Sequence, residues 1–372
     1  MRAATALLVS FILLPSIAHS LPIEYYDQLT SEQQQQGDEN VADNGDVAAL
    51  NSQELEGKQQ DEQEETDNDE KIDIFATERP LGHVSGLAID TNGHLVAFHR
   101  GDRTWNENSF NNDETFNKDL STIKNKTIAI IDKDGKIIDE FGDDMFYMPH
   151  GLTVDTKGDY WVTDVGSHQI HKIDGKTKKI VLTLGEKLVP GEDTNHFCKP
   201  TDVAVASNGH FFVADGYCNS RILKFDSRGN LIAQINAAYE EGAPMDFVVP
   251  HSLALIEDMN SICVADRENQ RVQCFSAGLA EGDRKLPTGI PITSANDIGR
   301  VFAIRERNHY LMGVTGSSDD VEAQLFTFDV QTGKTNTFAK GIENAHALAI
   351  SADGNVFVSQ LEPNRILKIS LL

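Results

Sequence analysis

Short runs that alternate apolar residues with small or polar ones recur along the chain from about residue 84 onward. Alternation of this kind is the period of a half-buried β-strand. Five of the runs begin alike, at Val84–Asp90, His150–Asp155, Thr201–Ala206, His251–Ile256 and His346–Ser351. The pattern therefore predicts a chain built from repeated β-units.

A turn signal and a second strand-like run follow each of these segments. Asn-Gly, Lys-Gly or Asp-Gly pairs stand at residues 92–93, 157–158, 208–209 and 353–354, and Asp258–Asn260 fills the same place in the fourth unit. Asn, Asp and Gly adopt the positive φ that tight hairpin turns require. A third run of the same kind closes each unit, so the unit is predicted to be an antiparallel sheet of three or four strands.

The spacing of the units predicts how many there are. An insertion at Asp102–Lys118, rich in Asn and Asp, lengthens the first step. The last step is about twice as long as the others, so a sixth, weakly matching unit is expected around Asp297–Asp329. Repeats at this pitch predict an all-β fold, a six-bladed β-propeller with NHL-like repeats, whose blades bury their faces against one another. A parallel β-helix, the alternative, has a much shorter repeat.

The segment before the repeats differs in composition. Residues 1–20 combine a basic residue, an apolar run and small residues at the cleavage positions, which predicts a signal peptide. Residues 21–75 are acidic and rich in Gln, with sixteen Asp or Glu and one Lys between residues 21 and 70, in a chain of net charge −26. Such a segment has too little apolar surface to offset its ordering entropy, so it is expected to be disordered. The propeller domain is then residues 76–372.

Composition also limits location and partners. After the signal peptide no run approaches the roughly 20 apolar residues of a membrane span, so a protein of the secretory pathway is expected, in the granule lumen or secreted. The chain has no basic stripe, which argues against nucleic acid as a partner. Asn125-Lys126-Thr127 is a glycosylation sequon, with Asn125 as the acceptor. The protein is expected to act as a monomer.

Four cysteines stand in the middle of the chain, at Cys198, Cys218, Cys263 and Cys274. An even number in a secreted chain indicates two disulfides, for which three pairings are possible. The favoured pairing is Cys198–Cys218 with Cys263–Cys274, because each pair brackets one short strand–turn–strand unit.

Three histidines occupy one position of the repeat, directly before the inner strand. His150, His251 and His346 fall in units two, four and six, whereas units one and three have Ser85 and Thr201 there. Inner strands of a propeller surround its central channel, so alternate blades would bring three imidazoles together with near three-fold symmetry. Three histidines and one open position are typical of a catalytic zinc site. The alternative is that the histidines cap the strands or pack in the core.

Other candidates follow the second strands of the units. Arg100 ends that strand in unit one, Tyr217 follows it in unit three and Arg267 in unit four. A tyrosine beside a cation can act as a base, and an arginine can hold a carboxylate through two hydrogen bonds. Ion pairs between blades and a packed ring are the alternatives. Three recurring aspartates are expected to be turn acceptors: Asp164, Asp215 and Asp266.

Six motifs carry a family resemblance: Phe98–Asp102, Met148–Leu152, Asn195–Cys198, Asp215–Arg221, Val249–Leu253 and Ala265–Asn269. In combination they resemble the peptidyl-α-hydroxyglycine α-amidating lyases (peptidylamidoglycolate lyases), the lyase domain of the peptide-amidating system. The resemblance covers about residues 77–371 and is thin from 276 to 342. The companion copper monooxygenase domain has no counterpart in this sequence, which indicates a free-standing lyase.

The resemblance implies a zinc-dependent enzyme that cleaves a C-terminal peptidyl-α-hydroxyglycine into a peptide amide and glyoxylate. It implies that Tyr217 is the general base, that Arg100 lowers the pKa of Tyr217, and that Arg267 binds the substrate carboxylate, all three in contact with substrate. The family's disulfides agree with the favoured pairing. The implied zinc ligands are His150, His251 and His346.

The resemblance also implies a structural calcium, but one ligand differs. In the family an Asp directly after the third zinc histidine binds calcium, and Ala347 stands there in this chain. The other ligands would be the main-chain carbonyls of Val84 and Leu152. Carbonyls without a carboxylate bind Ca²⁺ weakly, so the sequence makes calcium doubtful here.

Three functions follow from these observations. The first is an active zinc lyase that acts after a separate peptidylglycine monooxygenase, on peptides ending in α-hydroxyglycine. The second, which Ala347 keeps open, is a lyase-like propeller with impaired catalysis that binds peptides. The third is a metal-dependent hydrolase or lactonase, whose site usually has calcium bound by Asp, Asn and Glu rather than histidines.

Overall fold

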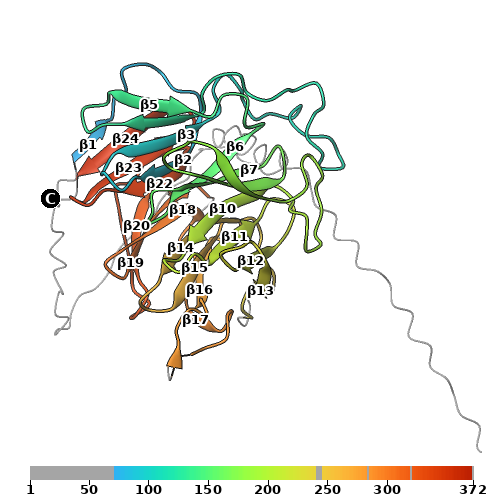
Figure 1. Ribbon diagram of the computed structural model, residues 1–372. Helices are drawn as coiled ribbons and strands as arrows, with labels where there is room; N and C mark the ends of the chain where they lie inside the picture. Colours follow the sequence, from blue (N-terminus) through green and yellow to red (C-terminus); the bar gives the residue numbers. More distant parts are fainter. Residues whose placement is uncertain (1–70, 240–244, 283–284, 319–320, 371–372) are drawn as a thin grey trace, which may run out of the picture. The chain divides into compact units, whose positions relative to one another are not determined.

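The computed structural model describes residues 71–239, 245–282, 285–318 and 321–370 (Figure 1). The expected signal peptide and residues 21–70 of the acidic segment lie outside the described residues. Within them, 24 strands form six four-stranded antiparallel sheets and no α-helix occurs. The predicted six-bladed all-β propeller is confirmed. No helix of the described part has the length and apolar character that crossing a membrane would require.

Each blade has an inner, a second, a third and an outer strand. The inner strands are β2 (Val84–Ile89), β6 (Pro149–Val154), β10 (Pro200–Val205), β14 (Pro250–Ile256), β18 (Arg300–Arg307) and β22 (Ala345–Ile350). The second strands are β3 (Leu95–His99), β7 (Tyr160–Asp164), β11 (Phe211–Asp215), β15 (Ser261–Asp266), β19 (Tyr310–Gly316) and β23 (Asn355–Gln360). The third strands are β4 (Ile128–Ile131), β8 (Gln169–Ile173), β12 (Arg221–Phe225), β16 (Arg271–Ser276), β20 (Leu325–Asp329) and β24 (Arg365–Ser370).

The outer strands were not located by the repeat pattern. They are β5 (Ile137–Phe141), β9 (Ile180–Leu184), β13 (Leu231–Ile235), β17 (Pro291–Ala295), β21 (Thr335–Phe338) and β1 (Lys71–Ile74). They are short and largely exposed, with exposed apolar residues such as Val181 and Ile292, so their hydrophobic periodicity is weak.

The last blade takes its outer strand from the other end of the described chain. β1 pairs with β24, with Lys71 opposite Ser370 and Ile74 opposite Leu367 (Figure 1). Residues 71–74, which the expected boundary at residue 76 assigns to the acidic segment, thus form the outer strand of the last blade. The pairing joins segments about 300 residues apart, which no local pattern in the sequence reveals.

A β-bulge interrupts every inner strand near its start. Register shifts occur at Val84/Gly86, Pro149/Leu152, Pro200/Asp202, Pro250/Ser252, Val301/Ala303 and Ala345/Ala347. A bulge inserts an extra residue and re-aims its side chain. The residue at the bulge is a histidine in blades two, four and six.

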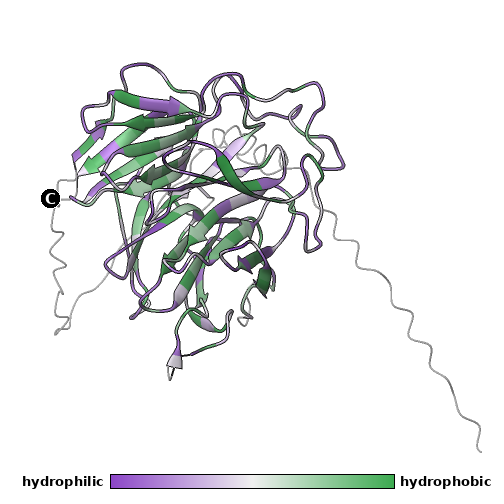
Figure 2. Cartoon of the chain, viewed as in Figure 1, coloured by the Kyte–Doolittle hydropathy of each residue, from purple (hydrophilic) through white to green (hydrophobic). Residues whose placement is uncertain are grey.

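Six hydrophobic clusters fill the seams between adjacent blades. The seam of blades one and two, for example, contains Phe98, Phe146 and Val162, all fully buried, with the rings of Phe98 and Phe146 edge to face at 4.9 Å. Figure 2 shows the apolar strands against polar connecting loops. Because each blade packs on two neighbours, the inner strands are held in fixed register around the channel.

Both predicted disulfides are present. Cys198, just before β10, is bonded to Cys218, just after β11. Cys263 of β15 is bonded to Cys274, which lies directly opposite on β16. The favoured pairing is confirmed. Asn125 is exposed, as a glycosylation acceptor must be, and its modification stays a prediction.

Candidate active site and metal centre

The three bulge histidines converge at the channel. His150, His251 and His346 are buried, their ring centroids lie 4.8 to 5.0 Å apart, and one potential ligand atom from each lies within 4.8 Å of the others. The convergence expected from the repeat is therefore present.

Each imidazole is oriented by the main chain of the next blade. Nδ1 of His150 donates to the carbonyl of Thr201 at 2.8 Å. Nδ1 of His251 donates to the Phe302 carbonyl at 2.6 Å, and Nδ1 of His346 to the Ser85 carbonyl at 2.9 Å. A carbonyl only accepts, so Nδ1 carries the proton and Nε2 keeps its lone pair. Such an outer hydrogen bond is what fixes a metal-binding histidine.

The site keeps these histidines neutral. Burial lowers the pKa of His346 to about 3, with the positive charge of Arg100 adding to the effect. Burial also holds the pKa values of His150 and His251 well below the usual value, with neighbouring histidines and Arg267 contributing. Neutral imidazole is the form that binds a metal. Three neutral histidines with unprotonated Nε2 atoms fit Zn²⁺, which prefers nitrogen and sulfur ligands.

Tyr217 lies over two of the histidines. Its hydroxyl is 3.0 Å from Nε2 of His150 and 3.2 Å from Nε2 of His251. The tyrosine is next to Cys218, so the Cys198–Cys218 disulfide anchors its loop beside β10. The disulfide thereby helps to hold the Tyr217 hydroxyl against two of the three imidazoles.

Arg100 is buried beside the same group. Its Nε donates to the carbonyl of Pro149 at 3.1 Å, and its guanidinium lies 5.3 Å from the centre of the Trp105 ring. Burial lowers the pKa of Arg100 to about 10, while Tyr217 acts in the opposite direction. Arg100 therefore remains a cation at neutral pH, and it interacts electrostatically with Tyr217.

Arg267 reaches the site from blade four. Its guanidinium carbon is 5.4 Å from the Tyr217 ring centre and 4.9 Å from that of Phe302, and its Nε donates to Glu268 at 2.6 Å. Arg300 of blade five donates to both oxygens of Glu268, at 2.8 and 3.1 Å. Burial raises the pKa of Glu268, but the two arginines outweigh the burial, and the pKa lies below its usual value. Glu268 is thus a fixed anion that orients Arg267.

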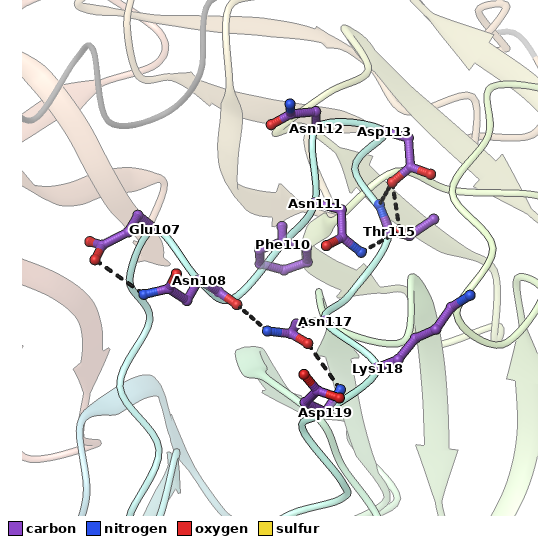
Figure 3. Close-up of a pocket in the computed structure, with 10 residues that line it drawn as sticks. All are labelled: Glu107, Asn108, Phe110, Asn111, Asn112, Asp113, Thr115, Asn117, Lys118 and Asp119. Carbon is purple, nitrogen blue, oxygen red and sulfur yellow. Dashed lines mark hydrogen bonds between the residues drawn. The ribbon is translucent and has the colours of Figure 1, made fainter.

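The insertion of blade one covers one side of the site. Trp105 lies 5.0 Å from the Tyr217 ring and 6.4 Å from the His150 ring. Figure 3 shows the outer part of the insertion, where Asn111 bonds Thr115 and Asn117 bonds the Asn108 carbonyl. These hydrogen bonds lie within the insertion, and Trp105 of the same insertion lies against the site.

The recurring aspartates behave as turn acceptors. Asp164 accepts from the backbone of Tyr147 and Met148. Asp215 accepts from the Cys198 backbone and Asp266 from that of Val248, and each also pairs with an arginine of the next strand. They join the end of each second strand to the loop that leads into the inner strand.

Arg305, which sequence reasoning did not single out, crosses the channel below the histidines. Leu152, an implied calcium ligand, has its carbonyl 3.5 Å from the Arg305 guanidinium. Ala347, which stands where the family has an Asp, lines the same small cavity as Arg305 and Leu152. The donors around the axis therefore do not fit calcium as the resemblance implied.

The sequence predicted the central residues of the site but not the residues that surround them. The structure brings together His150, His251, His346, Arg100, Tyr217 and Arg267. Glu268 stands in a motif that was recognised, but its partner Arg300 lies in the weakly matching unit. Trp105 lies in an insertion and Phe302 in that same unit, so no repeat register pointed to either.

Comparisons with known proteins agree with the fold. The NHL repeat model matches residues 146–173, 197–225 and 247–275, which are the first three strands of blades two, three and four. A gluconolactonase structure from Xanthomonas campestris has a TM-score of 0.55 at 14% identity, over 82% of this chain and 90% of that one. The fold and the histidine ring thus define an NHL-type propeller with a candidate metal centre in its channel.

Sequence relatives give the family. A probable peptidyl-alpha-hydroxyglycine alpha-amidating lyase of Caenorhabditis elegans is 66% identical over the full length of both chains. Peptidyl-alpha-hydroxyglycine alpha-amidating lyase 2 of Drosophila melanogaster is 38% identical over 79% of this chain and 72% of its own length. The mouse peptidyl-glycine alpha-amidating monooxygenase is 40% identical over 78% of this chain, which corresponds to 30% of the mouse protein. The chain belongs to the peptidyl-α-hydroxyglycine α-amidating lyase family and is an enzyme.

Proposed function

We propose that this chain releases glyoxylate and a peptide amide from peptides that end in α-hydroxyglycine, with Zn²⁺ held by His150, His251 and His346. The observation that carries the proposal is the convergence of three neutral imidazoles whose Nδ1 atoms are fixed by backbone carbonyls. Zinc, when bound there, would act as a Lewis acid toward an oxygen of the substrate.

The reaction needs a base and an acid at one place. The substrate carbon carries a hydroxyl, an amide nitrogen and a carboxylate. Tyr217, as a phenolate favoured by the charge of Arg100, takes the hydroxyl proton. The oxygen then forms the aldehyde C=O, the C–N bond breaks with its electron pair on nitrogen, and Tyr217 returns the proton to that nitrogen. The products are glyoxylate and the peptide amide.

The substrate carboxylate needs a cation close to Tyr217. Arg267 is supported for this role because its guanidinium lies at the rings of Tyr217 and Phe302 and its Nε donates to Glu268. A guanidinium oriented in this way matches the planar geometry of a carboxylate. Trp105 would contact the residue that precedes the hydroxyglycine, because it lies beside both Tyr217 and His150.

The cellular setting follows from the same chemistry. A separate peptidylglycine monooxygenase would have to supply the hydroxylated peptide, since the proposed substrate already carries the hydroxyl group. Two disulfides support the secretory pathway as the compartment, granule lumen or exterior.

The test is glyoxylate release from a short peptide ending in α-hydroxyglycine. Metal-stripped protein should be inactive, added zinc should restore release, and His150→Ala should stay inactive with zinc present. Wild-type protein that is folded and zinc-loaded but releases no glyoxylate would overturn the proposal. Binding of the peptide without release would instead favour a peptide-binding propeller with impaired catalysis.

A further inference from the structure

One position of the inner strands differs sharply between blades. The position in question lies three residues after the bulge residue. In five blades a small residue stands there: Ala88, Thr153, Ala204, Ala254 and Ala349. In blade five the residue at this position is Arg305, which pairs with Met312 of β19. The four alanines pack in the seams between blades, whereas blade five has a long cationic side chain at this position.

The Arg305 guanidinium connects blade five to three other blades. Its NH1 donates to Ser252 Oγ of blade four at 3.0 Å and to Asp202 Oδ2 of blade three at 3.2 Å. NH1 also lies 2.8 Å from the carbonyl of Ile304, and NH2 reaches the Leu152 carbonyl of blade two at 3.5 Å. A planar guanidinium with several donors can serve partners on several sides at once.

Asp202 is the anion that this cation faces. Its side chain is 4% exposed, against 21% for Arg305. One carboxylate oxygen accepts from the hydroxyl of Ser252 and the backbone of Leu253, both at 3.0 Å, and the other accepts from the Val203 backbone. A buried carboxylate needs a cation as well as hydrogen bonds, because an unpaired buried charge is strongly destabilising.

The position of Asp202 in the channel affects whether the implied calcium can bind there. By strand register Asp202 occupies in blade three the place that Ala347 occupies in blade six, directly after the bulge residue. The channel therefore still has a carboxylate at this level, but on another blade and already paired with Arg305. Calcium takes six to eight oxygen ligands with carboxylate charge among them. Here the Leu152 carbonyl and the Asp202 carboxylate both face a guanidinium, which would repel a second cation.

We propose that the Arg305 guanidinium is the fixed cation of the channel and takes the place of a structural calcium. Arg305 is a positioning residue, because it touches none of the proposed reacting groups. Its hydrogen bonds link blades two, three, four and five next to the three histidines His150, His251 and His346. These bonds hold the three histidines in place without a divalent ion. The small cavity lined by the histidines, Arg305 and Ala347 separates the two levels.

The first part of the test asks whether calcium binds. Wild-type protein, Arg305→Gln and the double variant Arg305→Gln/Ala347→Asp are loaded with zinc and equilibrated with millimolar calcium. Calcium per chain is then measured by elemental analysis, and Tm with and without calcium. We expect no retained calcium and an unchanged Tm for the wild type. The double variant, which restores the carboxylate and removes the cation, should retain about one calcium per chain and gain Tm when calcium is added.

The second part asks whether Arg305 stabilises the channel. Arg305→Gln should lower Tm by roughly 5 °C or more, because it leaves Asp202 buried and unpaired. Arg307→Gln is the matched control, since Arg307 lies on the same strand but contacts the carbonyls of Ser351 and Ala352. If Arg305→Gln does not fold, Arg305→Lys keeps the charge, loses the planar group and should give an intermediate Tm.

Three results would overturn the proposal. They are calcium retained by the wild type, an Arg305→Gln variant no less stable than Arg307→Gln, and a double variant that stays free of calcium. None of these measurements uses the lyase reaction, so their outcome is independent of whether the chain releases glyoxylate.

Discussion

Blades four and five adjoin each other at the channel, yet they contribute to it differently. Blade four matches the NHL repeat and provides His251 at its bulge. Blade five lies outside the matched residues and places Phe302 at the corresponding bulge, with Arg305 three residues further on. Its first two strands are also longer, with eight residues in β18 and seven in β19. The backbone position is common to both blades, so the repeat determines where a side chain lies but not which chemistry it has.

The two blades also depend on each other. The His251 imidazole donates to the carbonyl of Phe302, and Glu268 of blade four is held by Arg300 of blade five. Blade four thus provides groups that would act on substrate or metal, and blade five provides groups that orient them. Of the four experiments below, those on His251 and Glu268 test this division, and those on Tyr217 and His168 extend the comparison to blades two and three.

The largest effect is expected from removing the histidine of blade four. His251→Ala should abolish zinc retention and lower kcat/KM for glyoxylate release by at least about 1,000-fold. Phe302→Leu is the matched change in blade five and should keep zinc and lose far less activity, because the carbonyl that accepts from His251 remains and only the ring contacts with His251 and Arg267 are lost. Equal losses in the two variants would remove the distinction between the blades.

Tyr217→Phe should have the next largest effect. Without the hydroxyl the proposed base is lost, and kcat should fall by about 100- to 1,000-fold. Zinc content should remain that of the wild type, since the ligands are untouched. The measurement is steady-state kinetics beside elemental analysis. A variant that keeps most of its kcat would require another base.

A buried histidine in a turn of blade two should make the free energy of unfolding depend on pH. His168, after β7, is buried, and burial lowers its pKa to about 3, with the charge of Lys199 contributing. Its unfolded pKa is near 6.5, so the unfolded state takes up the proton first. The contribution of His168 to stability is present above about pH 6.5 and is lost as the pH falls, by about 2 kcal/mol between pH 7 and pH 5.

His168→Asn checks this assignment. Asn tolerates the positive φ of 59° at this position and keeps an acceptor for the Lys199 backbone. The urea midpoint of metal-free protein should change less between pH 7 and pH 5 in the variant than in the wild type. Identical pH dependence would mean that other groups are responsible.

The smallest effect is expected where the two blades meet. Glu268→Gln removes the anion shared by Arg267 and Arg300, so Arg267 should lose its fixed orientation. KM should rise roughly tenfold, which corresponds to about 1.4 kcal/mol, with a smaller change in kcat. Arg300→Gln should also raise KM, by a smaller factor. A fall in kcat with unchanged KM would mean that Glu268 acts on the reaction rather than on binding.

Regular segments of the chain could be predicted well. Alternation and turn dipeptides located the first three strands of the regular units, and Gly93, Gly158, Gly209 and Gly354 have the positive φ that their turns require. The cysteine pairing followed from spacing because each pair joins neighbouring strands. The histidine ring followed from one repeat position and the number of blades.

The parts that escaped prediction depend on contacts between distant segments. β1 pairs with β24 across nearly the whole domain, and the outer strands have little periodicity because one side of each faces solvent. Trp105 lies at Tyr217 only because the insertion folds back over blade three. Arg305 of blade five forms hydrogen bonds with residues of blades two, three and four.

The sequence by itself determined the repeat, the number of blades, the disulfides and the residues that could hold a metal, because these follow from local periodicity and spacing. Only the tertiary structure decided how those residues are oriented. The bulge in each inner strand and the carbonyl of the next blade fix every imidazole, and Arg305 rather than an acidic ligand shapes the channel below them. Such geometry arises from packing six sheets around one axis, where each blade completes the environment of its neighbour.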